Sequence, residues 1–169
     1  MITHYSEKEL KDKLKGLTVV CDSREQVNGH VTAWLDKNGI SHQSRALETG
    51  DYTAMLDGYT FEDEVVIERK ANLDEIAGNF TTGRERFERE MIRAKANGIK
   101  VFLIVENASW SDILLHNYRS ELKPKSFFAT LLSWQARFNL TIVFCKPSET
   151  GQILYGTLYY WARERLKRG

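Results

Sequence analysis

Acidic and basic residues gather at the ends of apolar segments in residues 50–74, GDYTAMLDGYTFEDEVVIERKANLD. Alternate side chains of a β-strand share a face, so Glu68 and Lys70 should point in the same direction. A hairpin turn in the middle of this stretch places Asp51 opposite residues 66–69, within reach of cross-strand neighbours. Two carboxylates and one ammonium group are therefore predicted to converge.

Two carboxylates at close range repel each other unless a cation lies between them. Oxygen ligands suit a hard divalent ion, so Asp51 and Glu68 predict a Mg²⁺ or Mn²⁺ site. Such an ion lowers the pKa of a bound water and neutralises charge on a phosphoryl oxygen, while the Lys70 ammonium can orient the water or stabilise the developing charge. This is the chemistry of phosphodiester hydrolysis. The alternative is that Glu68, Arg69 and Lys70 form a solvated charge run at an exposed strand end.

Further acids flank this group. Asp22 follows the apolar segment LTVVC, and Arg24 and Glu25 come directly after it. Ligands bind at strand ends in α/β folds, so Asp22 is a candidate site residue, the alternative being a turn or N-cap residue. Asp74 lies near the start of a further, short predicted helix, NLDEIAG, where a carboxylate can favour the helix dipole without any catalytic role.

The elements that must position these residues follow from hydrophobic periodicity and turn signals. They predict a mixed α/β fold, with a hairpin-rich first half and then strands joined through helices. Ser6 and Glu9 have the spacing of a capping box, which opens the first helix. The predicted helices cover residues 6–15, 29–38, 84–97, 125–138 and 149–167, and the predicted strands cover 17–21, 40–47, 51–56, 63–70, 101–105 and 140–145.

The composition restricts the class of protein. The chain has 169 residues, of which 42% are hydrophobic and 28% charged, with 2 Pro and 11 Gly, so collagen-like, low-complexity and wholly disordered classes are excluded. One domain over residues 1–169 is expected. No apolar run reaches the ~18 residues of a membrane helix, and the N-terminal segment lacks the apolar region of a signal peptide, which predicts a cytoplasmic protein without a membrane partner. Cys21 and Cys145 lie in apolar runs and are predicted to be buried free thiols.

Three segments together resemble a known family. GDY followed by ERKANLD resembles the GD…ERKxxxD signature of the XPF-type structure-specific endonucleases. VVCDSRE resembles that family's first strand with its D-x-R-E ending, and TTGRERFERE resembles the segment that follows the signature. The likeness covers about residues 17–105. It implies a restriction-endonuclease-like core, a central mixed β-sheet flanked by helices, and divalent-metal-dependent cleavage of DNA near branches or flaps.

The resemblance also implies roles for individual residues. Asp51 and Glu68 would be metal ligands, Lys70 would be the catalytic lysine, and Asp22 would be a further acid of the cleft and a third candidate ligand. Arg69, which faces away if the strand is regular, would hold the cleft together or meet a phosphate. The implied catalytic set is Asp22, Asp51, Glu68, Arg69, Lys70 and Asp74.

Arg24, Arg84 and Arg86 are the candidate DNA contacts. Arg84 matches the family's arginine, and helix geometry should turn it inward, toward the cleft. Arg86 lies on one helical stripe, which either follows phosphates or is a solvated face paired with neighbouring glutamates. The stripe consists of Arg86, Arg89 and Arg93, and the glutamates are Glu85, Glu88 and Glu90.

Family members commonly pair two such domains, so the resemblance implies a homodimer through the apolar faces of the helix SFFATLLSWQARF and of the last helix. The alternative is that these apolar residues belong to the core. The family's tandem helix-hairpin-helix domain and helicase segment are not expected here, so the chain resembles stand-alone nuclease domains of phages or other mobile genomes.

The leading hypothesis is a metal-dependent endonuclease that acts on branched, flapped or forked DNA. Two other enzymes on the same core are alternatives, a junction resolvase and an exonuclease. A third alternative, from a different class, is a non-catalytic DNA-binding partner module.

Overall fold

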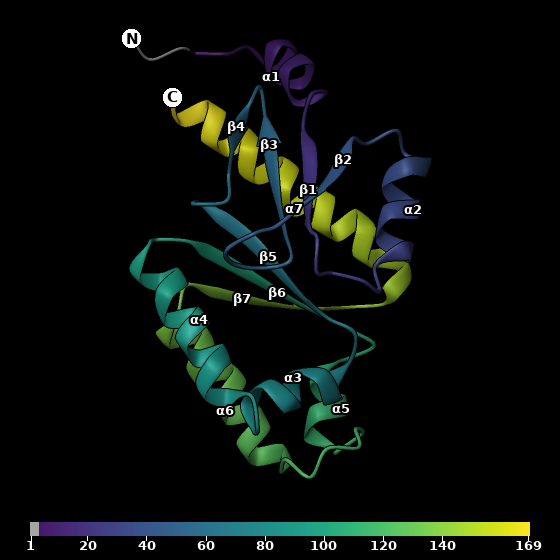
Figure 1. Ribbon diagram of the computed structural model, residues 1–169, viewed down its shortest axis with the longest axis vertical. Coiled ribbons are helices and arrows are strands. Elements are labelled where there is room, and N and C mark those ends of the chain that lie inside the picture. The colour runs from purple at the N-terminus through teal and green to yellow at the C-terminus, as the bar shows by residue number, and fades with distance from the viewer. Residues whose placement is uncertain (1–3) are drawn as a thin grey trace.

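A mixed seven-stranded β-sheet forms the centre of the protein in the computed structural model, which describes residues 4–169 (Figure 1). The strand order is β2-β1-β3-β5-β6-β7, and the short strand β4 pairs with β3 outside this path. Strands β5, β6 and β7 are parallel to one another, whereas β3 runs antiparallel to β1 and β5. The strands are β1 (Thr18–Asp22), β2 (His42–Arg45), β3 (Tyr52–Leu56), β4 (Tyr59–Thr60), β5 (Val65–Lys70), β6 (Lys100–Glu106) and β7 (Leu140–Cys145).

Helices cover both faces of the sheet. Helices α3 to α6 pack on one face, α2 and α7 pack on the other, and α1 lies against α7 (Figure 1). Side chains of β5 alternate between the two cores, with Val66 in the first and Val65 and Ile67 in the second. The helices are α1 (Glu7–Leu14), α2 (Gly29–Lys37), α3 (Leu73–Phe80), α4 (Arg84–Ala96), α5 (Trp110–Leu114), α6 (Pro124–Arg137) and α7 (Pro147–Arg168).

The predicted succession of helices and strands is confirmed, with small shifts at element ends. The capping box is present, because the Ser6 side chain accepts the Glu9 N–H and the Glu9 carboxylate accepts the Ser6 N–H. The strand predicted over residues 40–47 is shorter, because it is an edge strand whose only ladder partner in residues 4–169 is β1. Two elements were missed, β4 with two residues and α5 with five, since both are too short for a periodic pattern.

The hairpin register predicted for Asp51 is confirmed. Tyr52 pairs with Ile67, which places Asp51 opposite Glu68. The pairing of β3 with β4 is offset from this register by four residues, because the chain turns at residues 61–64 before β5 begins.

The burial of individual residues tests two further predictions, the free thiols and the apolar face of α6. Cys21 and Cys145 are free and buried, as expected, and burial raises the pKa of the Cys21 thiol to about 11. The apolar face of α6 lies within the core, where Phe127, Leu131 and Trp134 are buried. That face of α6 therefore packs inside the protein. Formation of a homodimer stays a prediction. None of the helices within residues 4–169 is long and apolar enough to cross a membrane.

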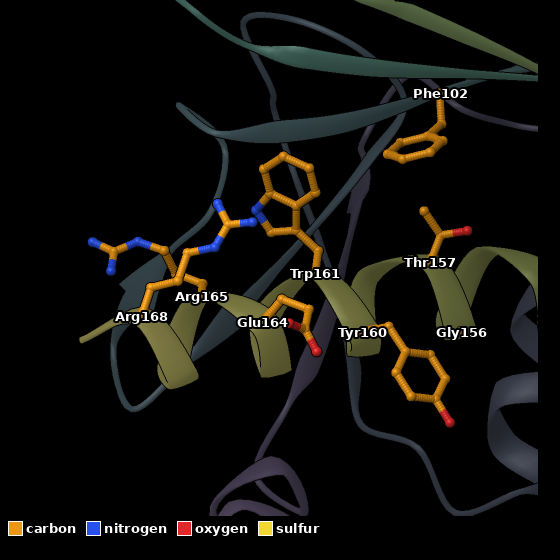
Figure 2. Close-up of a pocket in the computed structure, with 8 residues that line it drawn as sticks. All are labelled: Phe102, Gly156, Thr157, Tyr160, Trp161, Glu164, Arg165 and Arg168. Carbon is orange, nitrogen blue, oxygen red and sulfur yellow. The ribbon is translucent and has the colours of Figure 1, made fainter. Parts of the chain in front are cut away.

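A groove of about 570 Å³ lies between α7 and β6 (Figure 2). Phe102 and Trp161 extend into the space between the helix and the strand, whereas Tyr160 points away from the sheet. The indole N–H of Trp161 donates to Glu64 Oε2 at 3.3 Å, and Arg165 at the rim donates to Glu64 Oε1 at 3.3 Å. Glu64 therefore ties the start of β5 to the end of α7.

Candidate active site

A polar cleft of about 320 Å³ opens where β1 and β5 end and β3 begins. Glu68 and Lys70 reach it from the sheet face that α4 covers, and the Lys70 Nζ lies 5.3 Å from the centre of the Phe87 ring. Most of the predicted site residues meet here. The lining residues are Asp22, Arg24, Glu25, Glu48, Thr49, Gly50, Asp51, Glu68, Arg69, Lys70, Glu75, Arg86 and Glu90.

Backbone contacts hold Asp51 over the end of β5. Its N–H donates to Ile67 O at 2.8 Å, its carbonyl accepts the Asp22 N–H at 2.7 Å, and its Oδ2 accepts the Arg69 N–H at 2.8 Å. The preceding Gly50 has a φ of 75°, and a Cβ there would lie 2.7 Å from Val66 Cβ. The GD pair is thus a structural requirement, since only glycine brings the chain this close to β5 in a left-handed conformation.

Burial and like charge set the protonation of the two carboxylates. Burial and then the neighbouring Glu68 raise the pKa of Asp51 from its ordinary 3.8 to about 8, against the opposing effect of the Arg69 N–H. Burial also raises the pKa of Glu68, although the Lys70 ammonium 3.0 Å from its Oε1 acts in the opposite direction. Burial lowers the pKa of Lys70, but Glu68 outweighs this and the pKa is raised overall. At neutral pH the cleft therefore keeps a proton on Asp51 and a positive charge on Lys70.

The donor set of the cleft suits a hard cation. Seven acidic and four basic side chains line it, a formal excess of three negative charges. A divalent ion would relieve the repulsion between Asp51 and Glu68, and Mg²⁺ is often held by one or two carboxylates together with water and phosphate oxygens. Across residues 4–169 no three His, Cys, Asp or Glu side chains are arranged to hold an ion by themselves. The pair fits such an ion, and metal binding stays a prediction.

The third predicted ligand, Asp22, is occupied by other contacts. Both of its oxygens contact the Arg24 Nε, at 3.3 and 3.0 Å, and its Oδ1 also accepts the Leu47 N–H at 3.0 Å. Arg24 in turn donates to Leu47 O at 2.6 Å. Asp22 thus fastens the loop that precedes Gly50, and it would have to release Arg24 before it could bind an ion.

Comparison with known proteins shows to which family the chain belongs. The ERCC4 domain family matches residues 21–157 of the chain, well over half of its length. The chain belongs to the ERCC4 domain family. No protein with a curated function matches the sequence.

Two solved structures share the fold of this ERCC4 domain. XPF from Aeropyrum pernix is 23% identical with a TM-score of 0.66, and the alignment covers 88% of this chain and 63% of that one. XPF from Aeropyrum pernix in complex with DNA is 21% identical with a TM-score of 0.64, covering 88% of this chain and 66% of that one. The chain thus spans slightly less than two thirds of either. The mixed sheet flanked by helices and the resemblance to XPF-type nucleases, both expected from the sequence, are confirmed.

Arg69 of the ERCC4 domain points to the opposite sheet face from Glu68 and Lys70, as its place in the strand predicts. Its Nη2 and Nε contact the Glu25 carboxylate at 2.8 and 3.2 Å, and its Nη1 donates to Glu106 Oε2 at 3.1 Å. The arginine is therefore clamped between two acids, in agreement with the role of holding the cleft together.

Asp74 and Arg84 are placed differently from the other site candidates. The Asp74 Oδ1 accepts the Arg119 and Ser120 N–H groups at 2.8 and 2.7 Å, and Asp74 is absent from the cleft lining. Arg84 was expected to face the cleft, but its guanidinium lies 5.9 Å from the centre of the Trp134 ring. This expectation was wrong, because Arg84 at the start of α4 is exposed, lies over the Trp134 ring and is absent from the cleft lining.

Arg86 lies on the rim of the cleft, where its Nε contacts Glu90 Oε1 at 3.4 Å and its side chain is 85% exposed. The other arginines of the stripe also have local partners. Arg89 lies 4.0 Å from Glu85, and Arg93 donates to Glu48 O at 3.2 Å. These weak, exposed contacts leave the stripe free to exchange its partners for phosphates.

Several residues in the cleft or directly behind it escaped the sequence analysis. Glu106 ends β6 after the apolar run VFLIV, in the way that Glu68 follows VVI in β5, and this shared pattern could have revealed it. Glu75 also lines the cleft and accepts the Ala71 N–H at 2.7 Å. Glu48 and Glu90 carry no comparable signal, because they reach the cleft only through tertiary packing.

Proposed function

We propose that this ERCC4 domain is a divalent-metal-dependent DNA endonuclease that hydrolyses phosphodiester bonds in branched, flapped or forked DNA. Three observations support this: the family, the fold shared with an XPF that has been solved in complex with DNA, and the chemistry of the cleft. The observation that carries it is the convergence of Asp51, Glu68 and Lys70 on one cleft.

Each of these residues has a role that follows from its surroundings. Asp51 and Glu68 would hold a Mg²⁺ or Mn²⁺ ion, which when bound supplies an activated water and neutralises phosphoryl charge. Lys70 keeps its proton because of Glu68, so it can stabilise negative charge that develops on the phosphate. Asp51 must lose its proton to act, and the approach of a positive charge favours that loss.

The rim of the cleft offers contacts for the DNA backbone. Arg24 and Arg86 lie on the rim with side chains 71% and 85% exposed, and the stripe on α4 continues from Arg86. Arginines of this kind position phosphates without reading the base sequence. This agrees with an enzyme that selects the structure of its substrate and not its sequence.

The experiment that tests the proposal combines substrates, metal and variants. The purified chain is incubated with end-labelled linear, flap, fork and four-way-junction DNA, with Mg²⁺ and with chelator. We expect Mg²⁺-dependent cuts near a branch, loss of cleavage in Asp51→Asn and Glu68→Gln with DNA binding retained, and a large loss in Lys70→Ala. Asp57→Asn, on the exposed hairpin turn, serves as the matched control.

The other outcomes separate the alternatives. Symmetric cuts restricted to four-way junctions would indicate a resolvase, and stepwise shortening of linear DNA would indicate an exonuclease. DNA binding without cleavage under any metal condition would indicate a non-catalytic module. Cleavage at the wild-type rate by Asp51→Asn would disprove the assignment of the site.

A further inference from the structure

A buried polar network lies behind the cleft, on the sheet face covered by α2 and α7, and the proposed chemistry does not use it. Its centre is Glu106, the last residue of β6, which is 2% exposed. Its Oε2 accepts from Arg69 Nη1 at 3.1 Å, and its Oε1 accepts from Thr150 Oγ1 at 2.7 Å. The same Oε1 lies 2.6 Å from His30 Nε2. One carboxylate therefore joins β5 to the first turns of α2 and α7.

The network ends at Arg69, which lies between two predicted catalytic residues in the sequence of β5. Arg69 stands between Glu68 and Lys70 in β5, so its side chain and theirs occupy opposite faces of the same three residues. Its own N–H donates to Asp51 Oδ2 at 2.8 Å. Any rotation of the backbone at Arg69 would move all three cleft groups together, and the grip on the guanidinium opposes that rotation.

We propose that Glu106 is a positioning residue, which anchors Arg69 from behind and so fixes the orientation of Asp51, Glu68 and Lys70 in the cleft. The proposal rests on the proposed nuclease function of that cleft. Glu25 grips the same guanidinium from the other side, but it comes from a loop, whereas Glu106 belongs to the strand that pairs with β5 residue by residue. The anchor is therefore built on a rigid element.

Stability alone does not explain a carboxylate at this position. Ile104 and Val105, the preceding residues of β6, are completely buried and apolar. Replacement of both partners of a buried ion pair by apolar residues is often neutral or stabilising, because the charges must give up their hydration. The three partners of Glu106 make sense when the orientation of Arg69 is the property that matters.

The experiment uses the full chain and three variants of Glu106, with Glu64→Ala as the matched control. Glu64 also accepts three side-chain hydrogen bonds and also ties the sheet to α7, but at the opposite end of β5. The readouts are the single-turnover rate at saturating Mg²⁺, the Kd for DNA, the thermal midpoint, and the exchange rate of the Arg69 amide hydrogen. All rates are measured well below the lowest thermal midpoint.

In Glu106→Ala we expect the rate to fall by about 10- to 100-fold with the Kd for DNA unchanged, the effect typical of residues that orient a catalytic group. The Arg69 amide should exchange faster. Glu106→Gln should restore the rate to within about threefold, since its carbonyl can accept from Arg69 and its amide can donate to Thr150. Glu64→Ala should lower the midpoint without changing the rate or the Arg69 exchange.

A folded Glu106→Ala with the wild-type rate, or with an unchanged Arg69 amide, overturns the proposal. If Glu106→Ala does not fold, Glu106→Asp replaces it, because the shorter carboxylate keeps the charge but cannot reach Arg69 and Thr150 together. If the wild-type chain cuts no DNA, the proposed function fails. In that case the exchange rate of the Arg69 amide hydrogen, compared between Glu106→Ala and Glu64→Ala, tests the positioning role without a measurement of activity.

Discussion

Replacement of Asp51 by Asn should make the protein more stable, and by an amount that grows with pH. In the unfolded chain Asp51 titrates near 3.8, whereas in the fold its pKa is about 8. Between these values the folded state holds a proton that the unfolded state has released, so wild-type stability decreases as the pH rises. Each pH unit costs about 1.4 kcal/mol, which gives about 2.7 kcal/mol between pH 5 and pH 7.

The Asp51→Asn variant does not lose stability in this way as the pH rises. Asn carries no charge, its carbonyl can accept the Arg69 N–H, and its amide can donate to Glu68. The assay is urea unfolding of wild type and Asp51→Asn at pH 5, 6, 7 and 8, with chelator present. The difference in unfolding free energy should rise by about 2.7 kcal/mol from pH 5 to pH 7. Asp57→Asn, at an exposed turn, should differ from wild type by no more than about 0.5 kcal/mol at every pH. A difference for Asp51→Asn that does not change with pH would refute the raised pKa and the crowding of charge on which it depends.

Four more outcomes follow from the same geometry. Mg²⁺ at about 100 times its Kd should stabilise the wild type by about 2.7 kcal/mol, and thermal scans should show no such gain in Asp51→Asn. Gly50→Ala should cost about 2–5 kcal/mol in urea unfolding, because it combines a left-handed backbone with a collision against Val66. Arg86→Ala should reduce the slope of log K for DNA against log salt by about 1, which binding titrations at several salt concentrations can measure. Asp74→Ala should cost about 1–2 kcal/mol of stability through two lost backbone hydrogen bonds, while the single-turnover cleavage rate stays within about threefold.

The sequence predicts this fold well where one physical signal dominates. The run VVIERK could be assigned to a strand because its first half is continuously apolar, as in a strand that is buried on both sheet faces. The turn signal after β3 placed Asp51 opposite residues 66–69, but the exact partner, Glu68, depends on the four-residue offset between the β3–β4 and β3–β5 pairings. Short elements were lost because they depend on tertiary contacts. Helix α5 spans five residues and is capped by Ser109, and β4 contributes only two residue pairs to the sheet.

Strand alternation predicts the direction of the side chains in the site, but no sequence pattern predicts the contacts that depend on tertiary packing. Alternation alone sends Glu68 and Lys70 to one face and Arg69 to the other, and the structure agrees. Helical periodicity failed for Arg84, because this residue lies in the first turn of α4, where the side chain is exposed and lies over the Trp134 ring. The partners of Arg69 come from residues 25 and 106, which no local pattern joins.

The charged groups on the two sides of strand β5 differ in how completely they are paired. Behind it, Arg69 contacts Glu25, Glu106 and the carbonyl of Val27, so each of its three side-chain nitrogens has an acceptor inside the protein. In front of it, within residues 4–169, Asp51 receives one N–H and Glu68 one ammonium, and the two acids repel each other. A fold selected for stability alone would satisfy both sides, because an under-paired buried carboxylate is costly. The imbalance is tolerable when a bound cation supplies the missing positive charge, which supports the proposal that the cleft in front of β5 is the active site.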